Sequence, residues 1–165
     1  MSTGDIGERR VEVESPYISG SVIESPVGLI LVGLDSRTNA MTMSYFSELA
    51  HHPTSLWVSI AQSSYTHSLI EESGQFSLVV LSIKQKEIAR ICGTVSGRNQ
   101  DKCAMLSLYR SRQNFLFLEG AICSTGCRLR DKRSVGDHTL FFADIVEGDL
   151  DTCQSGMSHL MLSDM

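Results

Sequence analysis

The chain has 165 residues, of which 42% are hydrophobic and 20% charged, and its formal net charge at pH 7 is −5. This length suits a single domain, residues 1–165 with a core at about 17–150, large enough to bury a hydrophobic core without metals or disulfides. The acidic balance argues against nucleic acid or an anionic membrane as the main partner, because both reward clustered positive charge. The polar amino terminus shows no secretory signal and the longest apolar stretch, Val27–Leu34, is too short to span a bilayer. We therefore expect a cytoplasmic protein.

The cysteine pattern indicates structural thiols. The five cysteines are Cys92, Cys103, Cys123, Cys127 and Cys153. Their odd number and irregular spacing suit a reducing compartment. Cys123 and Cys127 could share a metal on a helix, but the residues around them do not predict one. On a strand they would lie about 13 Å apart at roughly 3.3 Å per residue, beyond the about 7 Å that a disulfide allows. We predict no metal site.

Short apolar stretches rich in β-branched and aromatic residues predict strands over most of the chain. Strands are expected at Val22–Leu34, Leu56–Ala61, Phe76–Ile83, Leu116–Leu118, Ala121–Leu129 and His138–Val146. The turn-forming residues 35–39 should end the first strand. A polar loop is expected at Thr94–Lys102, followed by a short element around Ala104–Tyr109.

Two short helices complete the pattern. The first is expected at Thr66–Ser73, with Thr66 as its N-cap and Gly74 just past its end. The second is expected at Lys84–Cys92, ended by Gly93. Two helices are too few to cover both faces of a parallel sheet. The pattern therefore indicates a mainly β protein with a few short helices, arranged as an antiparallel barrel.

Three polar segments lie where the predicted strands give way to loops, and each could bind a phosphate. The first contains Asn39, Ala40, Met41, Thr42 and Ser44; the second contains Ser59, Ile60, Ser63, Ser64 and Thr66; the third contains Ser96, Gly97, Arg98 and Lys102. Amide groups at a helix start favour an anion, Arg98 can fork onto a phosphate, and Lys102 can supply a point charge. Taken singly, such segments are more often only caps or turns. The chain contains no P-loop, no G-x-G-x-x-G after a strand and no G-x-S-x-G.

The order of the segments is more informative than any one of them. Asn-Ala-Met-Thr comes first, then a strand ending in Ser-Ser-Tyr-Thr-His, then residues 69–76, then Ser-Gly-Arg-x-x-Asp-Lys, and finally Gly-Asp-His-Thr at 136–139. In this order and spacing the chain resembles the flavin reductase-like domain family from about Ser21 to Gly148. The resemblance is closest to the branch that includes flavoredoxin and archaeal ferric reductase.

The resemblance implies a fold, a cofactor and a site. The fold would be the FMN-binding split β-barrel, usually a homodimer, with FMN rather than FAD bound near the subunit interface. Residues 39–42 would border the isoalloxazine ring, and Ser59, Ser63, Ser64 and Thr66 would line the ribityl and phosphate path. Arg98 and Lys102 would neutralise the phosphate. His138 would contact the nicotinamide or another electron partner, although an imidazole that only completes a barrel strand remains an equal alternative.

Two departures from the family pattern concern the surroundings of the ring. The loop before the second strand usually reads Asp-Pro-Pro, whereas this chain has His52-Pro53-Thr54, which suggests altered substrate access. The strand at Phe76–Ile83 lacks the asparagine that the family usually carries near Val79 or Val80. Neither departure removes the phosphate-binding set.

The leading functional reading is a flavin reductase that takes a hydride from NAD(P)H and passes electrons through FMN to free flavin, iron(III) or a partner protein. One alternative is an FMN-containing electron carrier that does not oxidise NAD(P)H rapidly. Another is a non-catalytic binding module on the same barrel. A homodimer is expected both from the resemblance and from the apolar segments Phe115–Leu118 and Leu140–Phe142, which exceed what one small barrel is expected to bury.

Overall fold

The computed structural model describes residues 25–151, which form strands and a few short helices. The strands are β1 (Gly28–Leu34), β2 (Arg37–Met43), β3 (Phe46–His51), β4 (Thr54–Ala61), β5 (Gln75–Val80), β6 (Leu108–Arg110), β7 (Leu116–Leu118), β8 (Cys123–Val135) and β9 (His138–Leu150). The α-helices are α1 (Tyr65–Ser73) and α2 (Lys86–Thr94), with 3-10 turns η1 (Ile83–Gln85) and η2 (Cys103–Met105).

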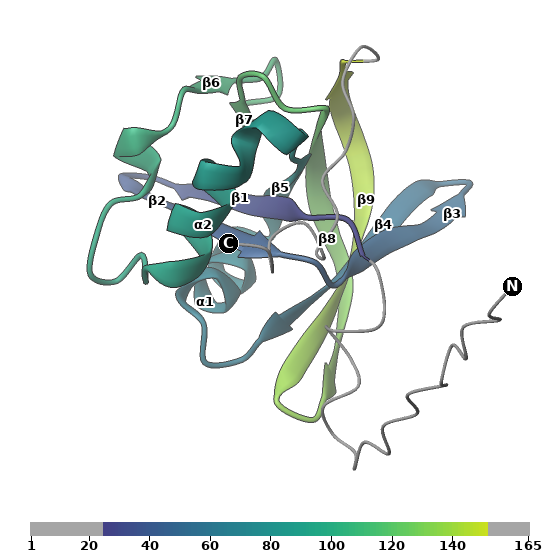
Figure 1. Cartoon of the computed structure of the whole chain (residues 1–165). Coiled ribbons are helices and arrows are strands. Elements are labelled where there is room, and N and C mark those ends of the chain that lie inside the picture. Colours follow the sequence, from purple (N-terminus) through teal and green to yellow (C-terminus); the bar gives the residue numbers. More distant parts are fainter. Residues whose placement is uncertain (1–24, 152–165) are drawn as a thin grey trace, which may run out of the picture.

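Seven strands form one antiparallel sheet in the order β2-β1-β5-β8-β9-β4-β3, and β6 pairs with β7 separately. The sheet curves without closing, so β2 and β3 remain edge strands. Both helices lie near the β1–β2 end of the sheet, and the β3–β4 hairpin projects from the opposite end (Figure 1). The predicted mainly β split barrel is confirmed.

Two hydrophobic cores lie on opposite faces of the sheet. One packs α2, η2 and β7 against β1, β2 and β5, and it includes Leu31, Ala40, Val79, Ala89 and Leu118. The other fills the curve of the sheet beneath α1, and it includes Ile30, Val58, Ile70, Phe76 and Phe141. Because alternate residues of β1 enter different cores, this strand is apolar throughout, as expected of a strand covered on both faces.

Several expected boundaries were wrong. Residues 37–39 belong to β2, because only Asp35 and Ser36 form the turn, and Asp35 adopts a positive φ of 51°. Strand β3 was not expected at all.

The N-cap of α1 is Ser64 rather than Thr66, and α2 continues through Gly93 to Thr94. Strand β8 extends to Val135, beyond the expected end. Residues 22–24 of the first expected strand and Cys153 lie outside the described residues.

The four described cysteines are free thiols. Burial raises the pKa of Cys92 to about 11 and that of Cys127 to about 12, so both thiols stay protonated near neutral pH.

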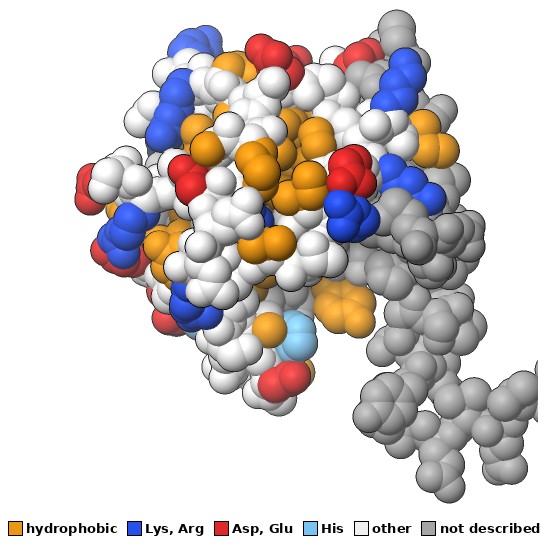
Figure 2. Space-filling view, turned by 60° about the vertical axis from the view of Figure 1, so that its left-hand side comes forward, with side chains coloured by type: hydrophobic (Ala, Val, Ile, Leu, Met, Phe, Trp, Pro, Cys, Tyr) orange, Lys and Arg blue, Asp and Glu red, His pale blue; other side chains and the backbone are white. Residues whose placement is uncertain are grey.

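On the face shown in Figure 2, hydrophobic side chains gather near the middle, and basic and acidic side chains alternate around them. No helix within residues 25–151 is long and apolar enough to cross a membrane.

Candidate functional site at the start of helix α1

The first turn of α1 carries backbone hydrogen-bond donors next to its serine cap. Ser64 caps the helix, and its Oγ accepts a hydrogen bond from the backbone N–H of His67 at 3.1 Å. The preceding amides of this turn have no acceptor within the helix, because the first N–H groups of any helix lack one. Together with the positive end of the helix dipole, they favour an anion.

Asn39 joins the edge strand β2 to this helix start. Its side chain is 3% exposed, and its Nδ2 donates a hydrogen bond to Thr66 Oγ1 at 2.8 Å. On its other side lies Gly97, where a Cβ would stand 2.0 Å from Asn39 Oδ1. Only glycine therefore fits at 97 while Asn39 keeps this position. The contact fixes the loop after α2 against both β2 and α1.

The three segments that were expected to bind phosphate meet around one pocket of about 270 Å³. Among its lining residues are eight of those predicted: Asn39, Met41, Ser64, Thr66, Ser96, Gly97, Arg98 and Lys102. Tyr65 and the last turn of α2 complete the wall. The sequence thus identified most of this pocket from segments that are distant along the chain.

The two expected phosphate cations have different surroundings. Arg98 is exposed, donates one hydrogen bond from Nη1 to Ser63 O at 3.2 Å, and stacks over the ring of Tyr65 at 5.4 Å from the centroid. Lys102 is 3% exposed, and its Nζ donates to Cys92 O at 3.0 Å and Val95 O at 2.7 Å. Burial lowers the pKa of Lys102. Its ammonium group mainly binds carbonyls at the end of α2, so Arg98 is the more accessible cation.

Other predicted residues do not line the pocket. The side chains of Ala40 and Ile60 are buried in the two cores. Thr42 Oγ1 donates to Ala89 O at 2.6 Å and so fixes α2 on β2.

Ser44 lies half-buried just after β2, and Ser59 lies half-buried on β4, where its backbone N–H donates to Tyr45 O. Ser63 faces Arg98 through its carbonyl rather than its hydroxyl.

His138 lies beside the turn that leads into α1. It is the first residue of β9 and pairs with Ala61 at the end of β4. Its Nδ1 is 2.7 Å from Asp137 Oδ1, and the hydrogen bond to this imidazole lowers the pKa of Asp137. Its ring lies 6.2 Å from that of Tyr45. Gln62 connects the two regions: its backbone N–H donates to Asp137 O at 2.9 Å and its Nε2 to His138 O at 3.2 Å.

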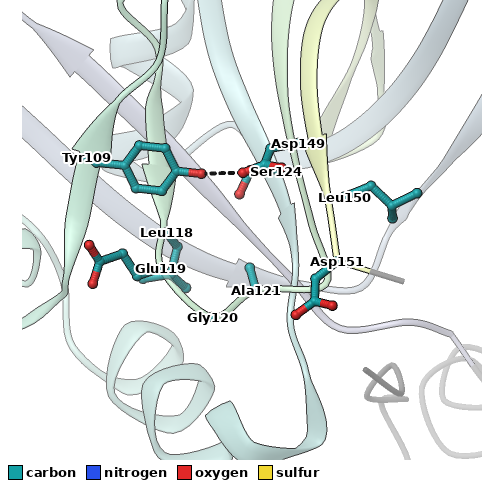
Figure 3. A pocket seen from close by; sticks show the side chains of 9 residues that line it. All are labelled: Tyr109, Leu118, Glu119, Gly120, Ala121, Ser124, Asp149, Leu150 and Asp151. Carbon is teal, nitrogen blue, oxygen red and sulfur yellow. Dashed lines mark hydrogen bonds between the residues drawn. The ribbon is translucent and has the colours of Figure 1, made fainter. Parts of the chain in front are cut away.

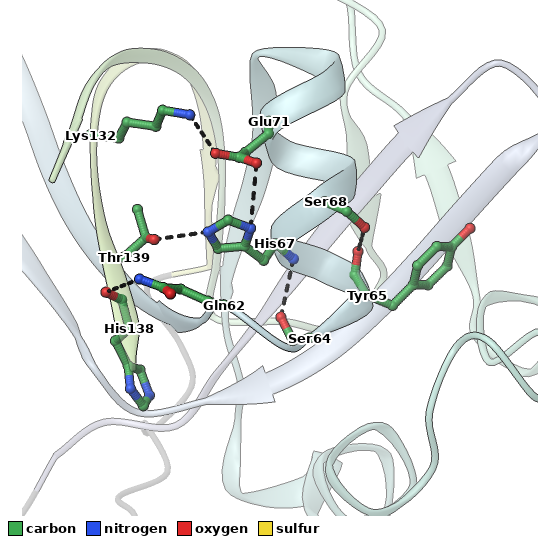
Figure 4. Close-up of polar contacts among 9 residues, drawn as sticks. All are labelled: Gln62, Ser64, Tyr65, His67, Ser68, Glu71, Lys132, His138 and Thr139. Atoms are coloured by element: carbon green, nitrogen blue, oxygen red, sulfur yellow. Dashed lines mark hydrogen bonds and ion pairs between the residues drawn. The ribbon is translucent and has the colours of Figure 1, made fainter. Parts of the chain in front are cut away.

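One polar residue near the site was missed by the sequence reasoning. His67, in the first turn of α1, is buried, and its Nε2 lies 2.8 Å from Thr139 Oγ1 (Figure 4). Its i+4 spacing from Glu71 was the available signal, because such pairs lie on one helix face.

Comparison with known proteins identifies the family and the fold of the chain. The family model described as "Flavin reductase like domain" matches residues 19–163. The chain belongs to the flavin reductase-like family. An uncharacterised protein of Archaeoglobus fulgidus is 33% identical over 121 residues, which cover 72% of this chain and 68% of that protein. The NADH-dependent FMN reductase AsuE2 of Streptomyces nodosus subsp. asukaensis is 24% identical, covering 85% of this chain and 75% of that protein.

The fold of this flavin reductase-like chain is also that of an FMN-binding protein from Thermus thermophilus, solved with bound 1-cyclohex-2-enone. The two superpose with a TM-score of 0.78 at 24% identity, covering 86% of this chain and 80% of the other. The departure at His52-Pro53-Thr54 lies in the turn of the projecting β3–β4 hairpin, away from α1 and α2 (Figure 1). None of these three residues lines the pocket beside α1.

A second cavity has a volume of about 290 Å³, similar to that of the pocket beside α1. It lies between β7, β8 and the end of β9, and the carboxylates of Glu119, Asp149 and Asp151 surround it (Figure 3). Tyr109 donates to Asp149 Oδ2 at 2.7 Å, and burial raises the pKa of Tyr109 to about 12. Three carboxylates would repel a phosphate. For a flavin reductase-like domain, the pocket beside α1 is the better candidate site.

Proposed function

We propose that this protein is a flavin-dependent oxidoreductase that uses FMN to pass electrons from NAD(P)H to an acceptor. The observation that carries the proposal is the pocket where the N-terminus of α1, the Asn39–Met41 edge of β2 and the Ser96–Arg98 loop meet. Its donors suit a phosphate, and family membership supports a flavin as the rest of the ligand.

The residues of the pocket fit this cofactor. Arg98 and the first amides of α1 would hold the phosphate, with the hydroxyls of Ser64 and Thr66 beside it. Asn39 and Met41 would border the ribityl chain and the ring, and Lys102 would support the loop that carries Arg98. When bound, the flavin would supply the redox chemistry, and this chain would supply position and electrostatics.

His138 and Tyr45 would orient the hydride donor. Their rings form a tilted pair; His138 starts β9 next to Ala61 and Gln62, and Tyr45 lies between β2 and β3. An imidazole there can donate a hydrogen bond to the nicotinamide amide without touching the phosphate. Good orientation matters because small errors in position reduce rates strongly.

We further propose a homodimer that works in the cytoplasm. The outer face of β4 and β9 supports the dimer, because Trp57, Leu140 and Phe142 share it and are only half-buried. The free thiols of the described residues suit a reducing compartment. The acceptor would be free flavin, iron(III) or a partner protein.

The test is a comparison of NAD(P)H oxidation by the FMN-loaded protein and by the same concentration of free FMN, with an electron acceptor in excess. The proposal predicts oxidation that is at least ten times faster with the protein. Binding of FMN without any acceleration would instead indicate an electron carrier. Failure to bind FMN would contradict the proposal altogether.

A further inference from the structure

A chain of polar contacts joins α1 to the hairpin formed by β8 and β9. His67 Nε2 lies 2.8 Å from Thr139 Oγ1, and His67 Nδ1 lies 3.7 Å from Glu71 Oε2. Glu71 in turn forms an ion pair with Lys132 on β8. Figure 4 shows Glu71 and His67 on the helix facing Lys132 and Thr139 on the hairpin.

The central contact is buried, which restricts its geometry. Thr139 is 3% exposed and His67 is 8% exposed, and the imidazole packs against Phe141 at 5.1 Å between centroids. Water has little access to either polar atom. Because a buried polar group without a partner is costly, each atom holds the other in place.

Both ends of this contact adjoin residues of the proposed site. The backbone N–H of His67 donates to Ser64 Oγ, the cap of the helix start. Thr139 directly follows His138 on β9. Gln62 makes a second link, because it donates to the carbonyls of Asp137 and His138. The helix start and the first residues of β9 are therefore fixed to each other at several points.

We propose that His67 is a positioning residue that, through Thr139, sets the distance and angle between His138 and the start of α1. The inference rests on the proposed function, in which α1 receives the flavin phosphate and His138 orients the hydride donor. Glu71 and Lys132 hold the imidazole from the exposed side. His67 itself touches neither flavin nor substrate.

The sharpest test is Thr139→Val, which keeps the shape of the side chain and removes the hydroxyl that faces His67. We expect the stopped-flow rate of flavin reduction by NAD(P)H to fall about ten-fold, because orientation is lost. The FMN dissociation constant should change less than two-fold, because Arg98 and the helix amides are untouched. His67→Gln should retain more of the rate than His67→Leu, because an amide can still bond to Thr139.

The matched control is Thr125→Val. Thr125 is a partly buried threonine on β8 whose Oγ1 donates at 3.1 Å to Leu78 O on the neighbouring strand β5. The same chemical change there should leave the rate of flavin reduction at the parent value. An equal loss of rate in both variants would overturn the inference, since a general weakening of the sheet would then explain it.

Hydrogen exchange of the protein without flavin gives a readout that does not depend on activity. The amide of Gln62 donates to Asp137 O, so it reports whether the hairpin stays on the helix start. In Thr139→Val its exchange should speed up at least ten-fold, while core amides of β5 exchange as in the parent. Unchanged exchange at Gln62 would overturn the inference. A parent protein that binds no FMN would contradict the proposed function, and the Gln62 amide would still decide whether the link exists.

Discussion

Arg98 and Lys102 belong to one short loop, yet their side chains lie in different surroundings. Arg98 is exposed at the mouth of the pocket and makes one hydrogen bond, whereas Lys102 is buried and donates to two carbonyls. The sequence indicates both cations but not this difference, because Lys102 depends on where α2 ends. The two residues therefore lead to different predictions.

Arg98→Gln should weaken FMN binding roughly ten- to hundred-fold and leave riboflavin binding nearly unchanged. A charge-assisted contact to phosphate is worth about 1.5–3 kcal/mol, and riboflavin lacks the phosphate. Titration with both ligands measures the difference. Equal losses of affinity for FMN and riboflavin would show that Arg98 does not bind the phosphate.

Lys102→Gln should act mainly on stability. Its ammonium group satisfies Cys92 O and Val95 O, and a glutamine amide cannot reach both, so we expect the free energy of unfolding to fall by about 1–3 kcal/mol. Denaturant unfolding of the protein without flavin measures this loss. A variant as stable as the parent that loses only FMN affinity would show that Lys102 binds the phosphate directly.

Gly97→Ala should disturb the pocket, whereas Gly93→Ala should be tolerated. At 97 the new Cβ would stand 2.0 Å from Asn39 Oδ1, and Asn39 is itself held by Thr66, so one of them must move. Such overpacking costs about 1–3 kcal/mol and should also lower FMN affinity.

Gly93 is the matched control for Gly97, because it lines the same pocket and its Cβ would make only an ordinary contact with Thr42, at 3.4 Å. Alanine there also favours the helix by about 1 kcal/mol. In thermal melts, the change in melting temperature relative to the parent should therefore differ in sign or size between the two variants. Identical melts would contradict the tight contact between Gly97 and Asn39.

At the scale of elements, the sequence predicted the buried strands and both helices but not the edge strands. Strand β3 shows no alternation of apolar and polar residues, because nearly all of it is exposed. Four of the seven residues of strand β2 are polar, among them Asn39, which lines the pocket, and Thr42, which bonds to α2. The polar residues of the proposed site therefore hide the apolar pattern that would have predicted this strand. Their proposed role in binding was inferred from the order of the motifs along the chain.

Glu147 on β9 holds the loop before β7 in place. Its carboxylate accepts hydrogen bonds from Ser111 Oγ and from the backbone amides of Arg112 and Gln113. The bond from Ser111, followed by those from the two amides, lowers the pKa of Glu147 below its ordinary value. A carboxyl group whose pKa is lower in the folded state adds stability above its unfolded pKa, and this stability is lost as the pH falls.

Glu147→Gln should therefore reduce stability at neutral pH and flatten the decline of stability below about pH 4.3, the ordinary pKa of glutamate. The groups that donate to Glu147 are a hydroxyl and two backbone amides, all neutral, so most of the effect should persist in high salt; only the weaker attraction of the Arg112 guanidinium should be screened. Glu87→Gln is the control, because Glu87 bonds to the exposed cation Arg90, and its smaller effect should disappear in salt. Denaturant unfolding against pH at two salt concentrations tests both. A parent-like pH profile for Glu147→Gln would contradict the assignment.

In the whole molecule, only one of the two apolar segments that were expected at a dimer interface is open to a second copy. Residues 115–118 are buried inside the monomer, with exposures of 2–8%. Leu140 and Phe142 do remain partly open, next to Trp57 on the outer face of β4 and β9. This face, rather than β7, is where we expect a second copy to pack.

Leu140→Asp should convert a dimer into a monomer, and Leu150→Asp should not. Leu140 lies within the outer apolar face, whereas Leu150 is 63% exposed at the far end of the same strand. Burying a charge in a subunit interface is costly, so the first change should break the contact. Light scattering of the parent without flavin should give the mass of a dimer. A monomeric parent would contradict the dimer, and a dimeric Leu140→Asp variant would place the interface elsewhere.

We propose that the pocket at the start of α1 binds the phosphate end of FMN. The most direct test of this proposal is an equilibrium titration of the purified, flavin-free protein with FMN and with riboflavin, followed by flavin absorption and fluorescence. We expect FMN to bind saturably and at least ten times more tightly than riboflavin, and inorganic phosphate to compete with FMN alone. Equal affinity for FMN and riboflavin, or no binding of either, would contradict it.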